Sequence, residues 1–190
     1  PTTINNTETI ASVPAILQNG AQWFCDLGVP PNSGGTKIFS ISGHVNHAGN
    51  FEAPMGTPFE TLLALAGGIR QGHQLKAVIP GGSSMPVLPA TAMQGLHMDY
   101  DSVQKAGSML GSGAIIVMDE TTCMVRMLER ISRFYKHESC GQCTPCREGT
   151  GWMWRMMMRL VAGNAKGEDI VQLAGTAGNF NSFASTASIA

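Results

Sequence analysis

Charged residues are scarce in this sequence: Asp, Glu, Lys and Arg together make up 13% of its 190 residues. Globular domains usually carry about a quarter, so we expect other proteins to cover much of the surface. The formal net charge is −1, which gives no electrostatic basis for nucleic-acid binding. No apolar run approaches the roughly 18–20 residues that span a bilayer, so we expect no direct membrane insertion.

A signal peptide is also missing, and the chain begins with Pro1 rather than Met, so we expect a piece of a longer protein. There are five cysteines, an odd number that does not suit a disulfide framework. Because three of them are clustered, they indicate a reducing compartment and a metal site.

The clustered cysteines are Cys140, Cys143 and Cys146, in the pattern C-x2-C-x2-C. This spacing lets one short loop turn three thiolates toward a common centre, as in iron–sulfur loops. Thiolates are soft ligands that suit iron–sulfur clusters and zinc; reduced thiols without metal are the remaining alternative. A 4Fe-4S cluster or a structural zinc needs four ligands. The fourth must come from Cys123, from Cys25, from a missing segment or from a group other than cysteine.

Charged residues flank the three cysteines. Arg147 places a cation beside the third cysteine, which favours a reduced cluster, and Glu148 opposes that effect. His137 has two interpretations, a hydrogen-bond donor to cluster sulfur or a cation at a helix C-terminus.

Residues 37–79 have the pattern of a small α+β unit. Strands are expected over 37–45, with Phe39 and Ile41 on one face, and over 51–55. A capping box at 57–60 predicts a helix, and 75–79 reads as another strand. This order suggests a β-grasp fold.

The rest of the first 120 residues gives weaker signals. Asn6 or Thr7 is expected to cap a helix that ends at Gly20, and a short helix follows over 21–27. A Pro- and Gly-rich linker at 30–35 is the first predicted boundary. Residues 85–106 are expected to be irregular or partly helical, and 114–118 a buried strand.

Helices are expected beyond residue 120. Thr121 or Thr122 is predicted to cap the first, in which Cys123 is a packing residue. The Met-rich stripe from Trp152 to Val161 predicts a second helix whose apolar face is core and also shields the metal from water. Residues 168–175 are expected to form a third helix, and the last fifteen residues to be structurally weak.

The loop Pro80–Ser84 follows the strand at 75–79. Such Gly/Ser loops can hold phosphate with backbone N–H groups, but this one lacks the Walker lysine and the dinucleotide glycine pattern, so ligand contact and a plain loop both stay open. The scattered histidines show no ligand pattern and are expected at the surface or in turns. They are His44, His47, His73 and His97.

The run HESCGQCTPCREG at 137–149 closely resembles the cluster loop of the NADH-binding flavoprotein subunit of respiratory complex I, the 51 kDa or F subunit of NADH:quinone oxidoreductase. The resemblance extends to ISGHV at 41–45, VIPGGSS at 78–84, AIIVMD at 114–119 and PTTINNTET at 1–9. It covers about residues 1–165.

The resemblance implies that NADH passes a hydride to FMN, which releases electrons singly into iron–sulfur clusters that lead to quinone. It implies a 4Fe-4S cluster on this chain, with FMN as cofactor and NAD as substrate of the complete subunit. The matching residues are, for the cluster, Cys140, Cys143 and Cys146 and, for the FMN phosphate and ribityl region, Ile4, Asn5 and Asn6.

The implied fold class is α+β, a β-grasp (ubiquitin-like) domain followed by a helical bundle that carries the cluster loop. Residues 1–35 would end the flavin-binding domain, 36–118 would be the soluble-ligand-binding β-grasp domain with its connection, and 119–190 the helical domain with a divergent tail. The chain is expected to be a C-terminal fragment, inactive alone. The family's fourth cysteine, expected near Thr186, is missing.

The resemblance also implies partners and a location. Expected partners are the other complex I subunits, especially the small 2Fe-2S subunit and the large iron–sulfur subunit. The expected location is peripheral, on the cytoplasmic face of the bacterial inner membrane or the mitochondrial matrix side. Two alternatives stay open: a diaphorase subunit of an NAD-linked hydrogenase or formate dehydrogenase, and a β-grasp binding module with a zinc knuckle.

Overall fold

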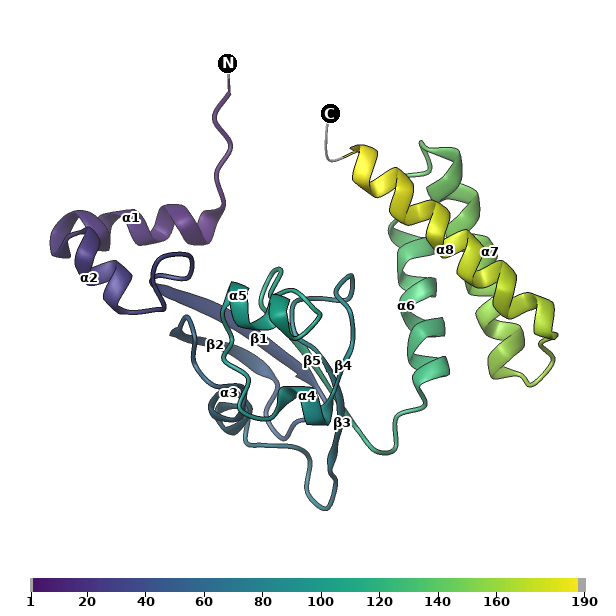
Figure 1. The fold of residues 1–190 in the computed structure, drawn as a ribbon, viewed down its shortest axis with the longest axis horizontal. Helices are drawn as coiled ribbons and strands as arrows, with labels where there is room; N and C mark the ends of the chain where they lie inside the picture. Colours follow the sequence, from purple (N-terminus) through teal and green to yellow (C-terminus); the bar gives the residue numbers. More distant parts are fainter. Residues whose placement is uncertain (1, 188–190) are drawn as a thin grey trace. The chain divides into compact units, whose positions relative to one another are not determined.

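The structure is a computed structural model that describes the backbone of residues 2–187 and the side chains up to residue 177 (Figure 1). The chain divides between Thr121 and Thr122 into two compact units. Unit 1 is the part up to Thr121 and unit 2 the part from Thr122 onward. The finer predicted domain bounds, at residues 35 and 118, stay predictions.

Unit 1 contains a five-stranded sheet. Its strands are β1 (Thr36–Gly43), β2 (Gly49–Pro54), β3 (Leu75–Ile79), β4 (Leu88–Pro89) and β5 (Ala114–Asp119). They lie in the order β2-β1-β5-β3-β4, and only the β1–β5 pair among them is parallel. A first hairpin whose leading strand pairs in parallel with the last strand is the β-grasp arrangement, and the predicted fold class is confirmed.

One face of this sheet carries the core of unit 1. Phe39 and Ile41 of β1 and Ile115 and Val117 of β5 are buried there, because alternate residues of a strand point to the same face. Leu62 of α3 (Phe59–Leu65) packs into the same cluster. The prediction that Phe39 and Ile41 share a face is confirmed.

The predicted capping box at the start of α3 is wrong. The N-cap is Pro58, which has no side-chain oxygen. The Thr57 hydroxyl donates to the Pro54 carbonyl at 2.7 Å, and Glu60 accepts the Gly95 N–H at 2.7 Å. Both side chains therefore bind groups outside the helix, a tertiary choice that the local motif does not encode.

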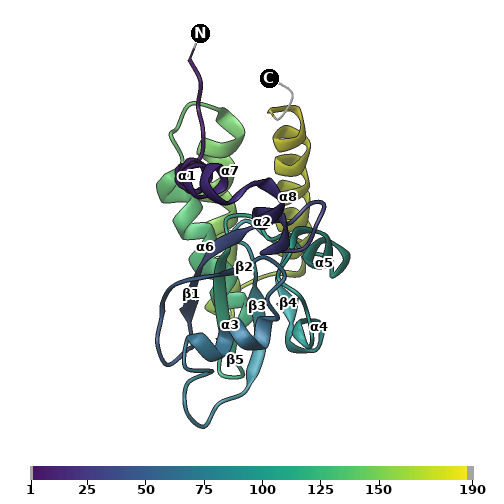
Figure 2. The same ribbon diagram turned by 90° about the vertical axis from the view of Figure 1, so that its left-hand side faces the viewer.

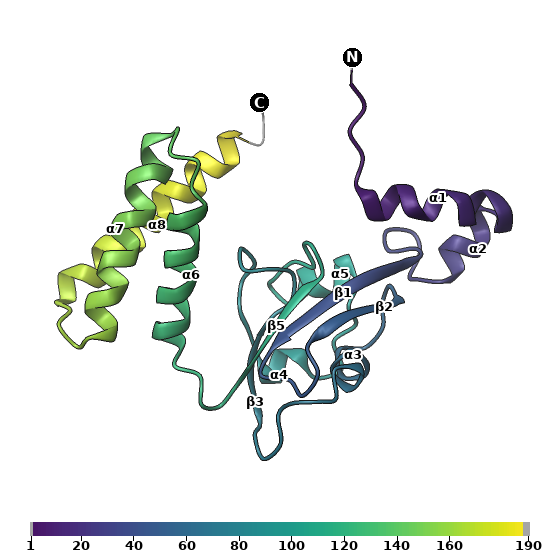
Figure 3. The ribbon, with the colours of Figure 1, turned by 180° about the vertical axis from the view of Figure 1, so that it is seen from behind.

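Short helices surround the sheet. They are α1 (Thr7–Asn19), α2 (Ala21–Asp26), α4 (Ala90–Met93) and α5 (Tyr100–Lys105). Figures 1 and 3 show α1 and α2 at the end of the sheet where β1 begins, and Figure 2 looks onto unit 1 from their side. The predicted partly helical segment at 85–106 is confirmed by α4 and α5.

The first helix begins and ends as predicted. The Asn6 side chain accepts the N–H groups of Glu8 and Thr9, and α1 ends at Gly20, whose φ is +91°. Positive φ is a conformation that glycine adopts without the Cβ penalty. The apolar residues Ile10 and Leu17 of α1 are nevertheless exposed, so within unit 1 this face of the helix is uncovered.

Unit 2 consists of three helices, α6 (Met124–Glu138), α7 (Thr144–Val161) and α8 (Gly167–Ala187). The α6 and α7 helices run in opposite directions as a hairpin, and α8 contacts α7 (Figures 1 and 3). The N-cap of α6 is Cys123, so the predicted capping by Thr121 or Thr122 is wrong.

One further prediction about unit 2 is wrong. The backbone of α8 continues to Ala187, so residues 176–187 are helical, whereas the last three residues lie outside the described part.

The Met-rich stripe of α7 is partly buried. Met156 and Met157 are core residues, as predicted, but Trp152 is 54% exposed. Met156 lies ten residues beyond Cys146 on the same helix, about 15 Å along its axis. The shielding of the metal by this stripe stays a prediction.

None of the helices in the described residues combines the length and the apolar character needed to cross a bilayer.

Candidate metal centre

The three clustered cysteines lie at one end of the α6–α7 hairpin. Cys140 is exposed in the connecting segment, Cys143 is the N-cap of α7, and Cys146 is half-buried in the first turn of α7. None of them is in a disulfide. The predicted loop is therefore shorter than the motif, because the third cysteine belongs to the helix.

Gly141 allows the chain to turn between the first two cysteines. Its φ is +75°, and a Cβ at this position would meet nothing within 4 Å. The need for glycine is thus conformational and not steric. The Arg147 guanidinium donates to the Gly141 carbonyl oxygen at 3.2 Å, which ties the turn to α7.

Ser139 connects the turn to the third cysteine. It ends α6, where its N–H donates to the Tyr135 carbonyl. Its hydroxyl oxygen lies 3.2 Å from the Cys146 sulfur and accepts the Gly141 N–H at 3.3 Å. The role of Ser139 was not predicted from the sequence, although its position directly before the first cysteine is a signal that could have identified it.

The electrostatic surroundings favour a negatively charged group at the cysteines. Helix N-termini carry partial positive charge, and α7 begins between Cys143 and Cys146. Arg147 adds a cation, which Glu148 partly neutralises at 3.0 Å. His137 is exposed in the last turn of α6, which agrees with its interpretation as a helix C-terminal cation.

The donor set suits an iron–sulfur cluster by its chemistry. Three soft sulfur ligands lie within seven residues at the start of α7, and none of them is in a disulfide. Cys123 does not fit as the fourth ligand. It stands sixteen residues before Ser139, at the opposite end of α6 and about 24 Å away along the helix axis. The fourth ligand is therefore not a cysteine of unit 2.

The predicted flavin residues lie before α1 in unit 1. The Ile4 side chain is 89% exposed, and Asn5 is also exposed. The Asn6 side-chain oxygen is engaged with the N–H groups of Glu8 and Thr9. The structure places these three residues together in one extended segment, and their role in FMN binding stays a prediction.

A second polar cluster surrounds the buried side chain of Asp119 at the end of β5. It accepts hydrogen bonds from Arg70 and from the hydroxyl and N–H of Thr121, and His44 Nδ1 lies 3.0 Å away. Burial raises the pKa of Asp119, but the hydrogen bonds from Thr121 and Arg70 outweigh it and hold that pKa well below its ordinary value. His44 lies in a bend and is partly exposed, as predicted, but its contact with Asp119 was not predicted.

The neighbouring Glu120 belongs to this cluster. It accepts the Gln74 N–H at 2.7 Å, and His73 Nδ1 lies 2.9 Å from it. The N–H of Gln74 lowers the pKa of Glu120, and His73 adds to the effect. His73, Asp119 and Glu120 are close enough to share a cation, which the sequence analysis did not foresee. The guanidinium of Arg70 already neutralises Asp119, so the cluster is an ion-pair network.

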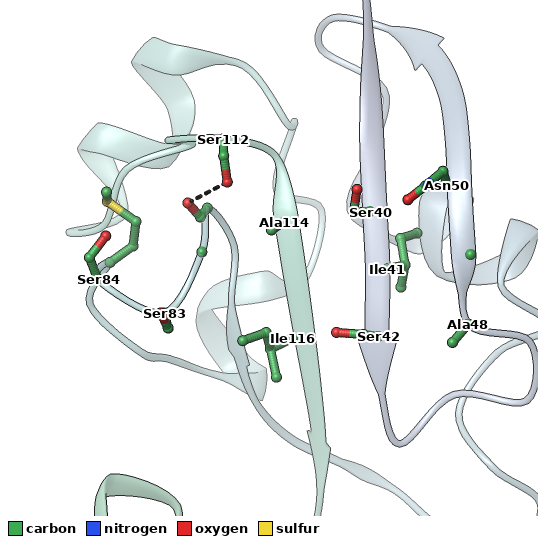
Figure 4. A pocket seen from close by; sticks show the side chains of 14 residues that line it. Ser40, Ile41, Ser42, Ala48, Asn50, Ser83, Ser84, Ser112, Ala114 and Ile116 are labelled. Atoms are coloured by element: carbon green, nitrogen blue, oxygen red, sulfur yellow. Dashed lines mark hydrogen bonds between the residues drawn. The ribbon is translucent and has the colours of Figure 1, made fainter. Parts of the chain in front are cut away.

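The Gly/Ser loop after β3 lines a hollow with a volume of about 880 Å³. Figure 4 shows Ser40 and Ser42 of β1 and Ala114 and Ile116 of β5 along it, on the sheet face opposite the core. Ser112 donates to the Gly81 carbonyl at 3.4 Å at its edge. Its lining contains no charged side chain, which disfavours a phosphate ligand but leaves a neutral ligand or a plain loop open.

Known families match both units. Residues 126–185 match the family described as the NADH-ubiquinone oxidoreductase-F iron-sulfur binding region, and residues 37–117 match the SLBB domain. The chain is thus similar to an SLBB domain in unit 1 and to an iron–sulfur binding region in unit 2.

Curated relatives are similar to this chain over a longer stretch than either family model. The chain is 59% identical over 175 residues to the F subunit of the NADH-quinone oxidoreductase of Rickettsia bellii, an alignment that covers 91% of this chain and 42% of the relative. The identity to the corresponding F subunit of Rickettsia typhi is 58%, with 91% and 41% covered. The chain thus spans about two-fifths of the length of these relatives. Over the aligned residues it is similar to the F subunits of NADH-quinone oxidoreductases.

A solved structure is also similar to this chain. The crystal structure of an NAD+-reducing NiFe hydrogenase in the air-oxidized state has a TM-score of 0.80 and 34% sequence identity to this chain. It covers 93% of this chain and 30% of the hydrogenase chain. The hydrogenase is a more distant relative by identity than the Rickettsia proteins.

Proposed function

We propose that this chain carries the electron-transfer part of an NADH:quinone oxidoreductase flavoprotein subunit, with Cys140, Cys143 and Cys146 as ligands of a 4Fe-4S cluster. The observation that carries the proposal is the position of three free cysteines within seven residues at the start of α7. A bound cluster supplies one-electron transfer. The role of the chain is to hold three thiolates in fixed positions and to stabilise their negative charge.

The chain's own groups support that role. The Arg147 guanidinium and the N-terminus of α7 place positive charge beside the thiolates. Ser139 and Gly141 fix the turn that presents Cys140. The proposal names three ligands, and the fourth would be a group other than a cysteine of unit 2.

The complete protein is proposed to oxidise NADH through FMN and to pass the electrons on toward quinone. Ile4, Asn5 and Asn6 would then contact the FMN phosphate and ribityl region. The 59% identity to the Rickettsia bellii protein supports this activity. NADH binding would need residues that the relatives have outside the aligned part.

The proposed partners are the other subunits of complex I, especially the small 2Fe-2S subunit and the large iron–sulfur subunit. The proposed location is peripheral, on the cytoplasmic face of the bacterial inner membrane or the mitochondrial matrix side. Unit 2 has eight Lys and Arg against five Asp and Glu, and α6 exposes Arg126, Arg130 and Arg133 on one face. Exposed apolar side chains such as Phe134 and Trp152 add surface that a partner could cover.

The second candidate function is a diaphorase subunit of an NAD-linked hydrogenase or formate dehydrogenase. The structural similarity to the NAD+-reducing hydrogenase favours it. The identity of 34% to that protein, against 59% to the Rickettsia bellii protein, makes it the weaker candidate. The remaining alternative is a β-grasp binding module in which the three cysteines bind zinc as a zinc knuckle.

The test is anaerobic reconstitution of the full chain with iron and sulfide, followed by iron and sulfide analysis and EPR of the dithionite-reduced protein. We expect a brown protein with an S = 1/2 signal. Cys143→Ser is expected to lose most of this signal. Cys123→Ser is the matched control, because Cys123 lies at the far end of α6, and it should retain the signal. A colourless protein that takes up zinc but no iron would refute the proposal.

A further inference from the structure

The hydroxyl of Ser139 is the one group among the described side chains for which a hydrogen bond to a candidate ligand sulfur is observed. Its oxygen lies 3.2 Å from the Cys146 sulfur. Both residues are partly buried, so water competes less for this contact than it would at Cys140 or Cys143, which are exposed. The contact connects the end of α6 to the first turn of α7.

The direction of this hydrogen bond follows if Cys146 is a metal ligand. The Gly141 N–H points to the Ser139 oxygen at 3.3 Å and occupies one of its lone pairs. The hydroxyl proton of Ser139 is left to point elsewhere. A cysteine bound to a metal is a thiolate and has no proton to donate, so Ser139 must be the donor to Cys146.

We propose that Ser139 is a positioning residue of the metal centre, which orients Cys146 and stabilises negative charge on its sulfur. The inference rests on the proposed function as far as the metal is an iron–sulfur cluster. Hydrogen bonds to ligand sulfur are among the factors that set cluster reduction potentials. Reduction adds negative charge to the cluster, so the hydrogen bond that Ser139 donates stabilises the reduced state more than the oxidised state.

The first test uses Cd²⁺ alone as the probe, because a soft cation binds thiolates without needing a cubane. Cd²⁺ affinity of the full, reduced chain is measured by calorimetry and by thiolate-to-metal absorption. Loss of a group that supports a ligand typically lowers metal affinity 10–100-fold, and for Ser139→Ala we expect about tenfold. Ser139→Thr keeps the hydroxyl, and Ser139 has φ −61° and ψ 125°, which a β-branched residue adopts easily. This control should bind Cd²⁺ as the wild type does.

The second test measures the potential of the reconstituted cluster by redox titration monitored with EPR. Ser139→Ala is expected to lower the equilibrium constant for reduction by up to about tenfold, which corresponds to a fall of 59 mV for a one-electron couple. Ser139→Thr should keep the wild-type potential. A residue that only supported the fold would reduce cluster occupancy without moving the potential of the clusters that remain.

The outcomes separate this inference from the proposed function. If Cd²⁺ affinity falls in Ser139→Ala and not in Ser139→Thr, but no chain takes up iron and sulfide, the hydrogen bond is supported and the iron–sulfur function fails. If the alanine and threonine variants have equal Cd²⁺ affinity, or if wild-type chain binds no Cd²⁺, the role of Ser139 is overturned. Equal potentials in the two variants overturn the effect on the cluster.

Discussion

The guanidinium of Arg147 reaches back from the first turn of α7 and donates a hydrogen bond to the carbonyl oxygen of Gly141. The contact closes a short ring of chain that contains Gly141, Cys143 and Cys146. It gives Arg147 a structural role in addition to the charge that it brings to the site.

The first prediction concerns this contact. Arg147→Ala should loosen the turn and make a reconstituted cluster release iron roughly 2–5-fold faster, because one half-exposed hydrogen bond contributes on the order of 0.5–1 kcal/mol. The rate is measured with a coloured iron chelator under anaerobic conditions. Arg155→Ala is the control, since Arg155 lies about two turns further along α7. Equal rates in the two variants would show that the Arg147 contact does not hold the turn.

The second prediction concerns the positive φ of Gly141. Gly141→Ala should destabilise the turn by about 1–2 kcal/mol, the cost of the left-handed conformation for a residue with a Cβ. Gly141→Asn should cost less, because asparagine tolerates this conformation better. Cluster occupancy after reconstitution checks the order Gly, Asn, Ala. An alanine variant with wild-type occupancy would contradict the conformational argument, since steric crowding is absent here.

The third prediction uses two adjacent methionines of α7. Met157 is 2% exposed and Met158 is 46% exposed. Met157→Ala should therefore lower the free energy of unfolding of unit 2 by about 2–4 kcal/mol through lost packing and a cavity. Met158→Ala should change it by less than about 0.5 kcal/mol. Urea unfolding followed by tryptophan fluorescence compares the two, and similar losses would mean that the α7 face is assigned wrongly.

The fourth prediction concerns pH and the carboxylates at the end of β5. Hydrogen bonds hold the pKa values of Asp119 and Glu120 below their ordinary values in the folded chain. The native state therefore gains stability above the unfolded pKa values, which are near 4, and loses it as the pH falls toward the folded values. The melting temperature should accordingly drop steeply between about pH 4 and pH 2.

Asp119→Asn provides the specific test of that pH dependence. The variant should melt at a lower temperature than wild type at pH 7, and the difference should shrink as the pH falls below about 4. Asp26→Asn is the control, because Asp26 is exposed and bonds only to nearby Gln22 among the contacts described for it. A constant difference at all pH values would show that the charge of Asp119 is not the cause.

The sequence predicted the elements whose signals are local. Phe39 and Ile41 are two residues apart, the spacing of a strand with one buried face. Asn6 and Gly20 mark the two ends of α1, Asn6 by its side-chain oxygen and Gly20 by its positive φ. The cysteine motif is likewise local, because its three cysteines lie within seven residues. These features need no knowledge of distant contacts.

The features that the sequence did not predict depend on distant partners. Thr57 and Glu60 look like a capping box, but Glu60 binds Gly95, which is 35 residues away. Asp119 and Arg70 are 49 residues apart and meet only in the folded sheet.

The parallel pair β1–β5 has a consequence for synthesis of the protein on the ribosome. Ser40 of β1 pairs with Ala114 of β5, so β1 stays without its second neighbour until 74 further residues have been made. At about 5–20 residues per second this takes roughly 4–15 s. The α6–α7 hairpin depends on contacts close in sequence and can form as soon as it leaves the exit tunnel. We expect the nascent sheet, and not the cysteine hairpin, to be the part of this chain that chaperones protect.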